Sequence, residues 1–174
     1  MRNASLAALA TSLTLTACMQ AGQPLTPADE TAVRAVMTGF VAAANANNIV
    51  GMTAPYASDA AVHPNGMPAA VGTAAIHQMW TDMEHAIRLT SFAFPTSRVA
   101  GQGDVAWITG TYRLAAVTTD SAATPLPQED GKFVTVLLRQ EDKSWKIVAD
   151  SWNTNAMPGA AAAPAAPALP ASRR

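Results

Sequence analysis

The sequence has little cysteine, few charged residues and no excess of basic residues. Each of these features excludes a class of protein or a means of stabilisation. Charged residues make up 13% of the 174 residues, about half of the usual share. The net charge of −1 offers no basic surface to phosphate groups, so we expect no nucleic-acid partner. Because Cys18 is the only cysteine, no intramolecular disulfide can form, and the domain must be stabilised by its core.

Histidine is also scarce, and its spacing argues against a metal site. His77 and His85 lie eight residues apart on a predicted helix, which separates them by roughly 12 Å along the axis. That distance is too long for both imidazoles to bind one metal ion directly. We therefore expect no metal and no other cofactor.

The start of the chain has the features of a bacterial export signal. Arg2 provides a thin positive start, and residues 6–15 form a mild apolar run. The run is shorter than the roughly 20 residues that a membrane-spanning helix needs. The segment Leu15-Thr16-Ala17-Cys18 resembles a lipobox, in which the cysteine is lipidated and becomes the mature N-terminus. We predict a lipoprotein anchored in the bacterial cell envelope. The alternative is an ordinary secretory signal with an incidental cysteine.

Composition divides the chain into four parts. The predicted signal peptide covers residues 1–17, and a tether covers residues 18–25. A folded domain is expected over residues 26–156. Residues 157–174 are almost entirely alanine and proline and cannot build a packed core, so we predict a disordered tail.

Within the domain, the hydrophobic period changes from helical to extended. Helices are predicted from Thr26 to about residue 44, over residues 49–56, and from Thr73 to about residue 87. Strands are predicted over residues 60–63, 89–100, 105–117, 132–140 and 145–155. This order predicts an α+β fold: a curved, mostly antiparallel sheet packed against three N-terminal helices. Such a sheet leaves a concave end at which pockets form.

Side-chain alternation assigns residues to the two faces of the sheet. Ile108, Gly110 and Tyr112 share one face, and the missing side chain at Gly110 makes Tyr112 a candidate for the pocket wall. Apolar residues occur on both sides of the strand at 132–140, so we expect cover over both of its faces. Trp107, Trp145 and Trp152 are assigned to the core or to a subunit interface.

Three segments resemble the nuclear transport factor 2 (NTF2)-like superfamily, in the branch of ketosteroid isomerase, SnoaL-like and DUF4440 domains. They are Tyr-Ala-Ser-Asp-Ala-Ala-Val-His-Pro at 56–64, Gly-Thr-Ala-Ala-Ile at 72–76, and the closing hairpin at 131–134 and 145–153. The similarity covers residues 26–155. It implies a cone-shaped fold, and a homodimer in which exposed aromatic side chains of the sheet pack together.

The resemblance also places functional positions on this chain. The isomerases use an aspartate base, while a tyrosine and a protonated aspartate stabilise the enolate oxygen. These positions fall on His63, Phe40 and Val136 respectively. Phe40 and Val136 cannot donate a hydrogen bond, and losing one such donor costs about a hundred- to a thousandfold in rate. The family's supporting aromatic positions fall on Tyr56 and Trp80, which implies an aromatic-lined pocket without steroid isomerase activity.

Two polar residues leave alternatives open. His63 stands at a predicted strand end before a Pro-rich turn, where it could act as a general base near neutral pH. The alternative is a strand-end histidine that is hydrogen-bonded to a nearby backbone group and needs no ligand. Asp150 could be a catalytic carboxylate, but we expect it to be an exposed partner of Arg139 or Arg113.

Three functions follow from these features. The first is a lipoprotein domain that binds a small apolar molecule without converting it. The second is an isomerase, cyclase or hydratase that uses His63 as general base. The third is an interaction domain that binds a partner through its sheet face.

Overall fold

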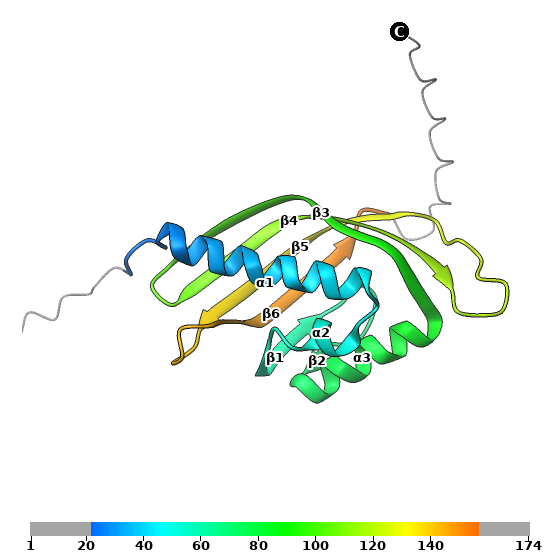
Figure 1. The fold of residues 1–174 in the computed structure, drawn as a ribbon, viewed down its shortest axis with the longest axis horizontal. Coiled ribbons are helices and arrows are strands. Elements are labelled where there is room, and N and C mark those ends of the chain that lie inside the picture. Colours follow the sequence, from blue (N-terminus) through cyan, green and yellow to red (C-terminus); the bar gives the residue numbers. More distant parts are fainter. Residues whose placement is uncertain (1–21, 157–174) are drawn as a thin grey trace, which may run out of the picture.

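A six-stranded sheet bent over a long helix forms the domain, as a computed structural model shows for residues 22–156 (Figure 1). The signal peptide at 1–17, the lipidation site Cys18 and the tail at 157–174 lie outside the described residues. The elements occur in this order along the chain: α1 (Pro27–Asn45), α2 (Ile49–Thr53), β1 (Tyr56–His63), β2 (Ala70–Val71), α3 (Thr73–Ala86), β3 (Ile87–Gln102), β4 (Val105–Thr118), β5 (Glu129–Arg139) and β6 (Trp145–Thr154). The predicted α+β class and cone-shaped fold are confirmed.

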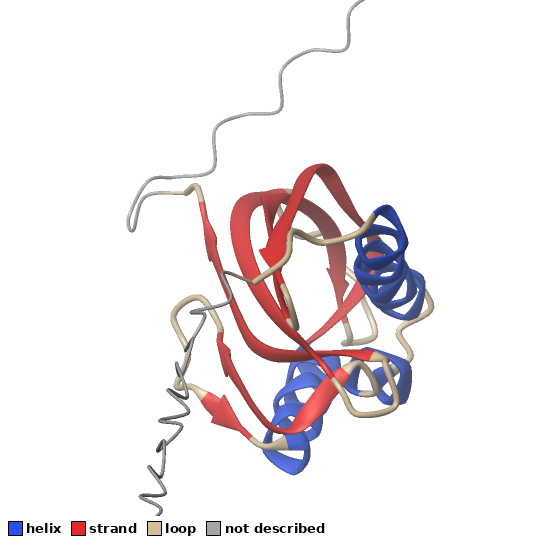
Figure 2. Cartoon of the chain, turned by 90° about the vertical axis from the view of Figure 1, so that its left-hand side faces the viewer, coloured by secondary structure: helices blue, strands red, loops and turns tan. Residues whose placement is uncertain are grey.

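The strands are arranged in the order β2-β1-β6-β5-β4-β3. All neighbouring pairs are antiparallel except β1 and β6, which run parallel. Irregularities in β3 between Leu89 and Ser91, and between Ala93 and Thr96, interrupt its pairing with β4. Such bulges bend a strand. Figure 2 shows the result: the long strands curl, and their concave side faces the helices.

Side-chain hydrogen bonds fix both ends of helix α1. The hydroxyl of Thr26 accepts from the backbone N–H of Asp29, and the Asp29 carboxylate accepts from Thr26 in return, which completes a capping box. Past the other end, the Asn47 side chain pairs with the N–H and the C=O of Leu89 on the edge strand β3. Asn45 pairs in the same way with Phe92. The two amides therefore hold α1 against the sheet.

The segment around β1 differs from the prediction in two respects. Helix α2 ends at Thr53 and strand β1 begins at Tyr56, four residues before the predicted start. Tyr56 is buried and pairs with Ile147 of β6, so tertiary packing extends the strand beyond its local pattern. The two-residue strand β2 was not among the predicted strands, and it pairs with β1.

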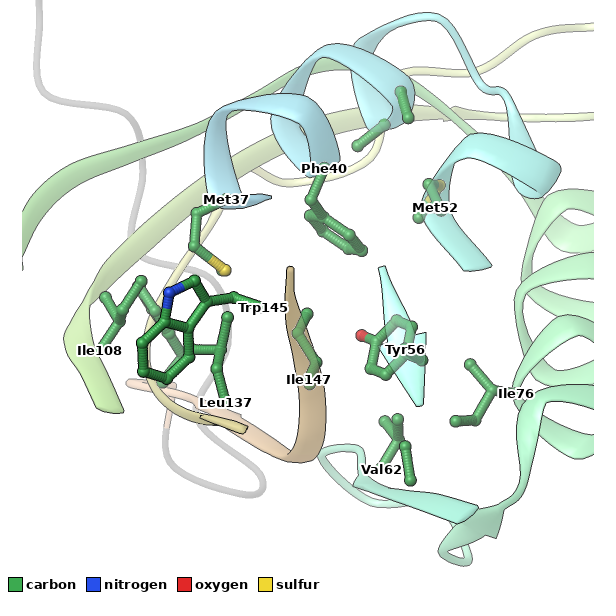
Figure 3. Close-up of a cluster of buried hydrophobic side chains, with 14 of the residues drawn as sticks. Met37, Phe40, Met52, Tyr56, Val62, Ile76, Ile108, Leu137, Trp145 and Ile147 are labelled. Atoms are coloured by element: carbon green, nitrogen blue, oxygen red, sulfur yellow. The ribbon is translucent and has the colours of Figure 1, made fainter. Parts of the chain in front are cut away.

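The core lies on the concave face of the sheet. Side chains from the sheet meet those of the helices in one cluster, in which Figure 3 labels Met37, Phe40, Met52, Tyr56, Val62, Ile76, Ile108, Leu137, Trp145 and Ile147. On the opposite face, Val134 is 47% exposed and Leu138 is 37% exposed. The outer face is therefore only partly covered in this chain by itself, because the described helices all pack on one side. Within residues 22–156, no helix combines the length and apolar character needed to cross a membrane.

Candidate functional site

A small apolar cavity of about 80 Å³ lies between the helices and the concave face of the sheet. Helices α1, α2 and α3 and strands β3 to β6 all contribute side chains to its wall. Most of the lining residues are methionine, leucine, isoleucine or aromatic, and the polar exceptions are Tyr112, Thr135 and Asp150. The full lining is Met37, Phe40, Ala44, Met52, Trp80, Met83, Ile87, Leu89, Phe92, Phe94, Tyr112, Leu114, Phe133, Thr135, Ile147, Asp150 and Trp152.

Asp150 is the acidic group in this lining, and it is 8% exposed. The hydroxyl of Tyr56 donates to its Oδ2 at 2.8 Å. The hydroxyl of Thr135 donates to its Oδ1 at 2.7 Å. None of the salt bridges within residues 22–156 involves Asp150. We call this group of three side chains the Asp150 cluster.

Burial controls the acid–base chemistry of the Asp150 cluster. Loss of water contact raises the pKa of the Asp150 carboxyl above its ordinary value of 3.8, and the hydrogen bonds from Thr135 and Tyr56 lower it in part. Burial also raises the pKa of Tyr56 well above its ordinary value, and the adjacent carboxylate reinforces that shift. Tyr56 therefore stays a donor, while Asp150 is a carboxyl with a raised pKa beside an apolar cavity. Such a group can hold or transfer a proton.

A bulge in β6 explains why Asp150 faces inward. Across β5 and β6, Leu137 pairs with Ile147, whereas the neighbouring Val136 pairs with Ala149. Val148 is thus an extra residue, and it reverses the alternation of faces beyond it. Without the bulge, Asp150 would lie on the opposite face from Ile147. Bulges often redirect side chains next to functional sites.

Stacked aromatic rings form one wall of the cavity. The rings of Trp80 on α3 and Trp152 on β6 are nearly parallel, with an interplanar angle of 8° and centroids 5.4 Å apart. Phe40 of α1 lies against Trp80 at 5.8 Å and Phe92 at 6.0 Å. Together these rings join helix to sheet and present flat apolar surface to an occupant.

Tyr112 occupies its place because position 131 has no side chain. A Cβ atom at Gly131 would lie 2.2 Å from the ring of Tyr112. The Tyr112 hydroxyl donates to Glu129, and burial together with that carboxylate raises the pKa of Tyr112. The phenol is therefore held neutral, with its ring in the cavity wall.

The structure brings some of the predicted site residues together and separates others. Phe40, Trp80 and Tyr112, which were predicted to bind a ligand, all line the cavity. Tyr56 does not line the cavity, but its hydroxyl binds Asp150, which does. Figure 3 shows this hydroxyl turned toward the interior beside Ile147. Val136 is half-buried on the outer face of β5, and its neighbour Thr135 takes the inward position.

The structure places Asp150, and not His63, beside the cavity. His63 is exposed at the end of β1 and does not belong to the cavity lining. Asp150 is buried in that lining, so its predicted exposed pairing with Arg139 or Arg113 is wrong. Those arginines bind other carboxylates instead: Arg113 pairs with Asp130, and Arg139 with Asp29 and Asp104.

Two other features of the described residues are less suited to a site. A wider groove of about 300 Å³ lies between α1 and β3, separated from the cavity by Met37 and Phe94, but it contains no buried charged group. Within residues 22–156, no group of three or more His, Cys, Asp or Glu side chains is close enough to hold a metal ion.

A cone-shaped α+β domain with a cavity on the concave face of its sheet defines an NTF2-like protein. Comparison with known families agrees, since residues 33–151 match the SnoaL-like domain family. The match spans most of the chain, and the protein therefore belongs to the SnoaL-like family. No curated protein matches the chain significantly.

Solved structures with the same fold include proteins described as isomerase-like and NTF2-like. A ketosteroid isomerase-like protein from Erwinia carotovora atroseptica is 15% identical, with a TM-score of 0.69 over 76% of this chain and 100% of its own. An NTF2-like superfamily protein from Salmonella enterica is 12% identical, with a TM-score of 0.65 over 75% and 93%. A protein from Catenulispora acidiphila in complex with S-DNPA is 14% identical, with a TM-score of 0.61 over 74% and 95%. At these identities the likeness establishes the fold.

Proposed function

We propose that this domain binds a small, mostly apolar molecule in the cavity beside Asp150. The single observation that supports this best is an apolar cavity with one buried carboxyl group in its wall. Ligand sites are commonly apolar hollows with a few well-placed polar groups that orient the ligand. The Asp150 cluster would supply that orientation, and the aromatic rings would supply the contact surface.

The dimensions of the cavity limit the size of the occupant. At about 80 Å³ it is far smaller than the roughly 300–1,000 Å³ of pockets that hold drug-sized ligands. It is also smaller than the roughly 150 Å³ of an apolar cavity that holds benzene, so a molecule with one or two rings can enter only if side chains of the wall move. Met83 and Trp152 are only half-buried, so their side chains have room to move as such a molecule enters.

The test is direct binding, with a variant that fills the cavity. The purified protein is examined by native mass spectrometry for a copurified small molecule, and bicyclic probes are then titrated by calorimetry. We expect Met83→Trp to abolish binding because the larger side chain occupies the cavity. Ala75→Trp is the control, since it places the same side chain on the exposed surface of the same helix. If Met83→Trp binds as well as the unmodified protein, the ligand site lies elsewhere.

A second candidate function is proton transfer, and the buried carboxyl of Asp150 is the observation that favours it. In this proposal Asp150, rather than the exposed His63, removes a proton from carbon next to a carbonyl group, exchanges it with water, and then donates a proton back to the same molecule. No oxidant or cofactor is needed, because the step only moves a proton. Exchange of enolisable protons for deuterium, followed by NMR, would depend on protein and disappear in Asp150→Asn. His63→Ala should leave the exchange rate unchanged, and loss of exchange in that variant alone would restore His63 as the base.

We further propose that the mature protein is lipid-anchored through Cys18 in the cell envelope. The lipobox-like segment is the support for this proposal. Expressed in a bacterial host, the full chain should partition into the membrane fraction, and Cys18→Ser should release it. A Cys18→Ser protein that remains in the membrane fraction would argue against lipidation.

The outer face of the sheet is the surface that we propose for a homodimer. Its large exposed apolar side chains, which we call the outer patch, are Val105, Trp107, Val134 and Leu138. Contiguous exposed apolar residues mark interaction surfaces. Light scattering should give a dimer mass for the unmodified protein and a monomer mass for Trp107→Glu. A monomeric unmodified protein would reject the dimer.

A further inference from the structure

A groove of about 300 Å³ lies between α1 and the edge strand β3, outside the main cavity. Met37 and Phe94 line both spaces and separate them. Most of the wall of the groove is apolar, and this part consists of Met37, Val41, Ala93, Phe94 and Ile108. The polar part includes Arg34, the one charged residue in the lining. The groove therefore combines an apolar wall with a single cation.

The walls of the groove contain an excess of positive charge. Arg34 is the only charged residue of α1 within residues 31–45, and β3 contains Arg88 and Arg98 but no acidic residue. Glu30 lies one turn before Arg34, yet Arg34 takes part in none of the salt bridges among residues 22–156. The side chain of Arg34 is exposed, so it can reach a molecule that enters from solvent. An anionic group is the complementary partner.

The edge of β3 is poorly suited to binding a peptide in this groove. Sheet edges bind extended peptides through their unpaired N–H and C=O groups. Beside the groove, however, Pro95 has no N–H, and the pairing of β3 is irregular between Ala93 and Thr96. Proline and bulges protect a sheet edge from an added strand. An aliphatic chain, which needs no backbone hydrogen bonds, is the better occupant.

We propose that the groove between α1 and β3 binds a fatty acid, with its chain on the apolar wall and its carboxylate on Arg34. A guanidinium group can bind a carboxylate through two parallel N–H groups. A methylene group is about as large as a water molecule, whose share of liquid volume is roughly 30 Å³, so the groove holds a chain of about ten carbons. That capacity suits one short chain, whereas a phospholipid has two longer chains. The site is separate from the cavity beside Asp150 and does not depend on the function proposed for that cavity.

Decanoate and 1-decanol separate recognition of the charge from recognition of the chain. The two molecules have equally long chains, and only decanoate is an anion. Their dissociation constants are measured by calorimetry. Arg34→Gln should weaken decanoate binding about two- to fivefold, as for the loss of an exposed ion pair, and should leave 1-decanol binding unchanged. Arg88→Gln is the matched control, because it removes the same charge from β3 at a position that does not line the groove. If Arg34→Gln weakens both probes equally, or neither, Arg34 does not bind the carboxylate and the proposal is overturned.

The position of the chain is tested with tryptophan substitutions at two exposed positions of α1. Thr38→Trp fills the groove and should abolish the binding of both probes. Ala32→Trp places the same side chain outside the groove and should bind both. Met83→Trp, which fills the main cavity, should also bind both, and a loss of binding in that variant alone would overturn the proposal.

Vesicles of phosphatidylglycerol distinguish a free fatty acid from a membrane lipid. We expect the Cys18→Ser protein, which lacks the proposed anchor, to bind decanoate and not to bind these vesicles. Binding to the vesicles without binding to decanoate would assign the groove to a membrane lipid and overturn the proposal. A protein that binds neither decanoate nor 1-decanol would overturn it as well.

Discussion

Asp150 and Asp29 each bind a residue that is distant in the sequence, but the two carboxyl groups lie in opposite electrostatic environments. Asp150 is buried and receives two hydroxyl donors, one of them from Tyr56, which lies 94 residues away along the chain. Asp29 lies at the start of α1 and binds Arg139 of β5 at 2.6 Å. The first aspartate has neutral partners, whereas the second has a cation.

The consequences for their pKa values are opposite in sign. Burial raises the pKa of Asp150 because water no longer stabilises its charge. Hydrogen bonds from Arg139 and Thr26 hold the pKa of Asp29 far below its ordinary value of 3.8. Charge is thus favoured at Asp29 and disfavoured at Asp150. The half-buried, ion-paired carboxylate of Asp29 therefore serves the fold, whereas the buried carboxyl of Asp150 can gain or lose a proton next to a cavity.

The largest expected effect comes from removing the buried carboxyl. Asp150→Ala leaves the hydroxyls of Tyr56 and Thr135 without their acceptor, and each unpaired buried group costs about 1–3 kcal/mol. We expect a loss of roughly 2–4 kcal/mol in the free energy of unfolding, measured by urea denaturation. Asp150→Asn should lose less, because its amide still offers an acceptor and a donor to the two hydroxyls. If Asp150→Ala is as stable as the unmodified protein, the cluster contributes nothing to the fold.

The dependence of stability on pH should separate the two aspartates by sign. For Asp150, the contribution is fully present below pH 3.8 and is lost as pH rises through the raised pKa of the folded state. For Asp29, the contribution is present above pH 3.8 and is lost as pH falls through the lowered pKa of the folded state. Both contributions can be measured by urea denaturation from about pH 2 to pH 8. The proteins compared are the unmodified protein, Asp150→Asn and Asp29→Asn.

The result is read from two curves, each of which gives the unfolding free energy of the unmodified protein minus that of one variant as a function of pH. Relative to Asp150→Asn, the stability of the unmodified protein should decline as pH rises above 3.8. Relative to Asp29→Asn, it should decline as pH falls below 3.8. Slopes of the same sign would show that folding lowers the pKa of Asp150 rather than raising it, and a flat curve for Asp150 would show that folding leaves its pKa unchanged.

Most of the fold could be predicted from local patterns, because the period of apolar residues changes sharply between helices and strands. The start of α1 follows from the cap at Thr26, and α3 begins at Thr73, where its helical apolar stripe was predicted to begin. Strand β2 could not be predicted, because two residues contain no period. The overall arrangement of these elements was predicted from the resemblance to the NTF2-like superfamily, and the match to the SnoaL-like family confirms that resemblance.

The site was harder to predict because its chemistry depends on contacts across the sheet. Charged residues are seldom buried, so an exposed ion pair was the natural expectation for Asp150. The bulge at Val148 reverses the face of Asp150, and alternation counted from Ile147 therefore gives the wrong side. Its partners Thr135 and Tyr56 lie on other strands. Which residues meet across strands depends on the pairing register, which local sequence does not determine. The aromatic wall, by contrast, followed from the positions of Phe40, Trp80 and Tyr112.

The smallest expected effect tests the asymmetry within the Asp150 cluster itself. Thr135→Val keeps the shape of a buried β-branched side chain and removes one donor to the carboxylate. Because that hydrogen bond favours the ionised form, its loss should raise the pKa of Asp150 further, which an NMR titration of the carboxyl carbon would detect. We expect a stability loss of about 1 kcal/mol. Thr109→Val is the control, since Thr109 is half-buried on β4 and does not line the cavity. An unchanged pKa in Thr135→Val would mean that the hydrogen bond from Thr135 does not affect the proton affinity of Asp150, and that Thr135 only fills space.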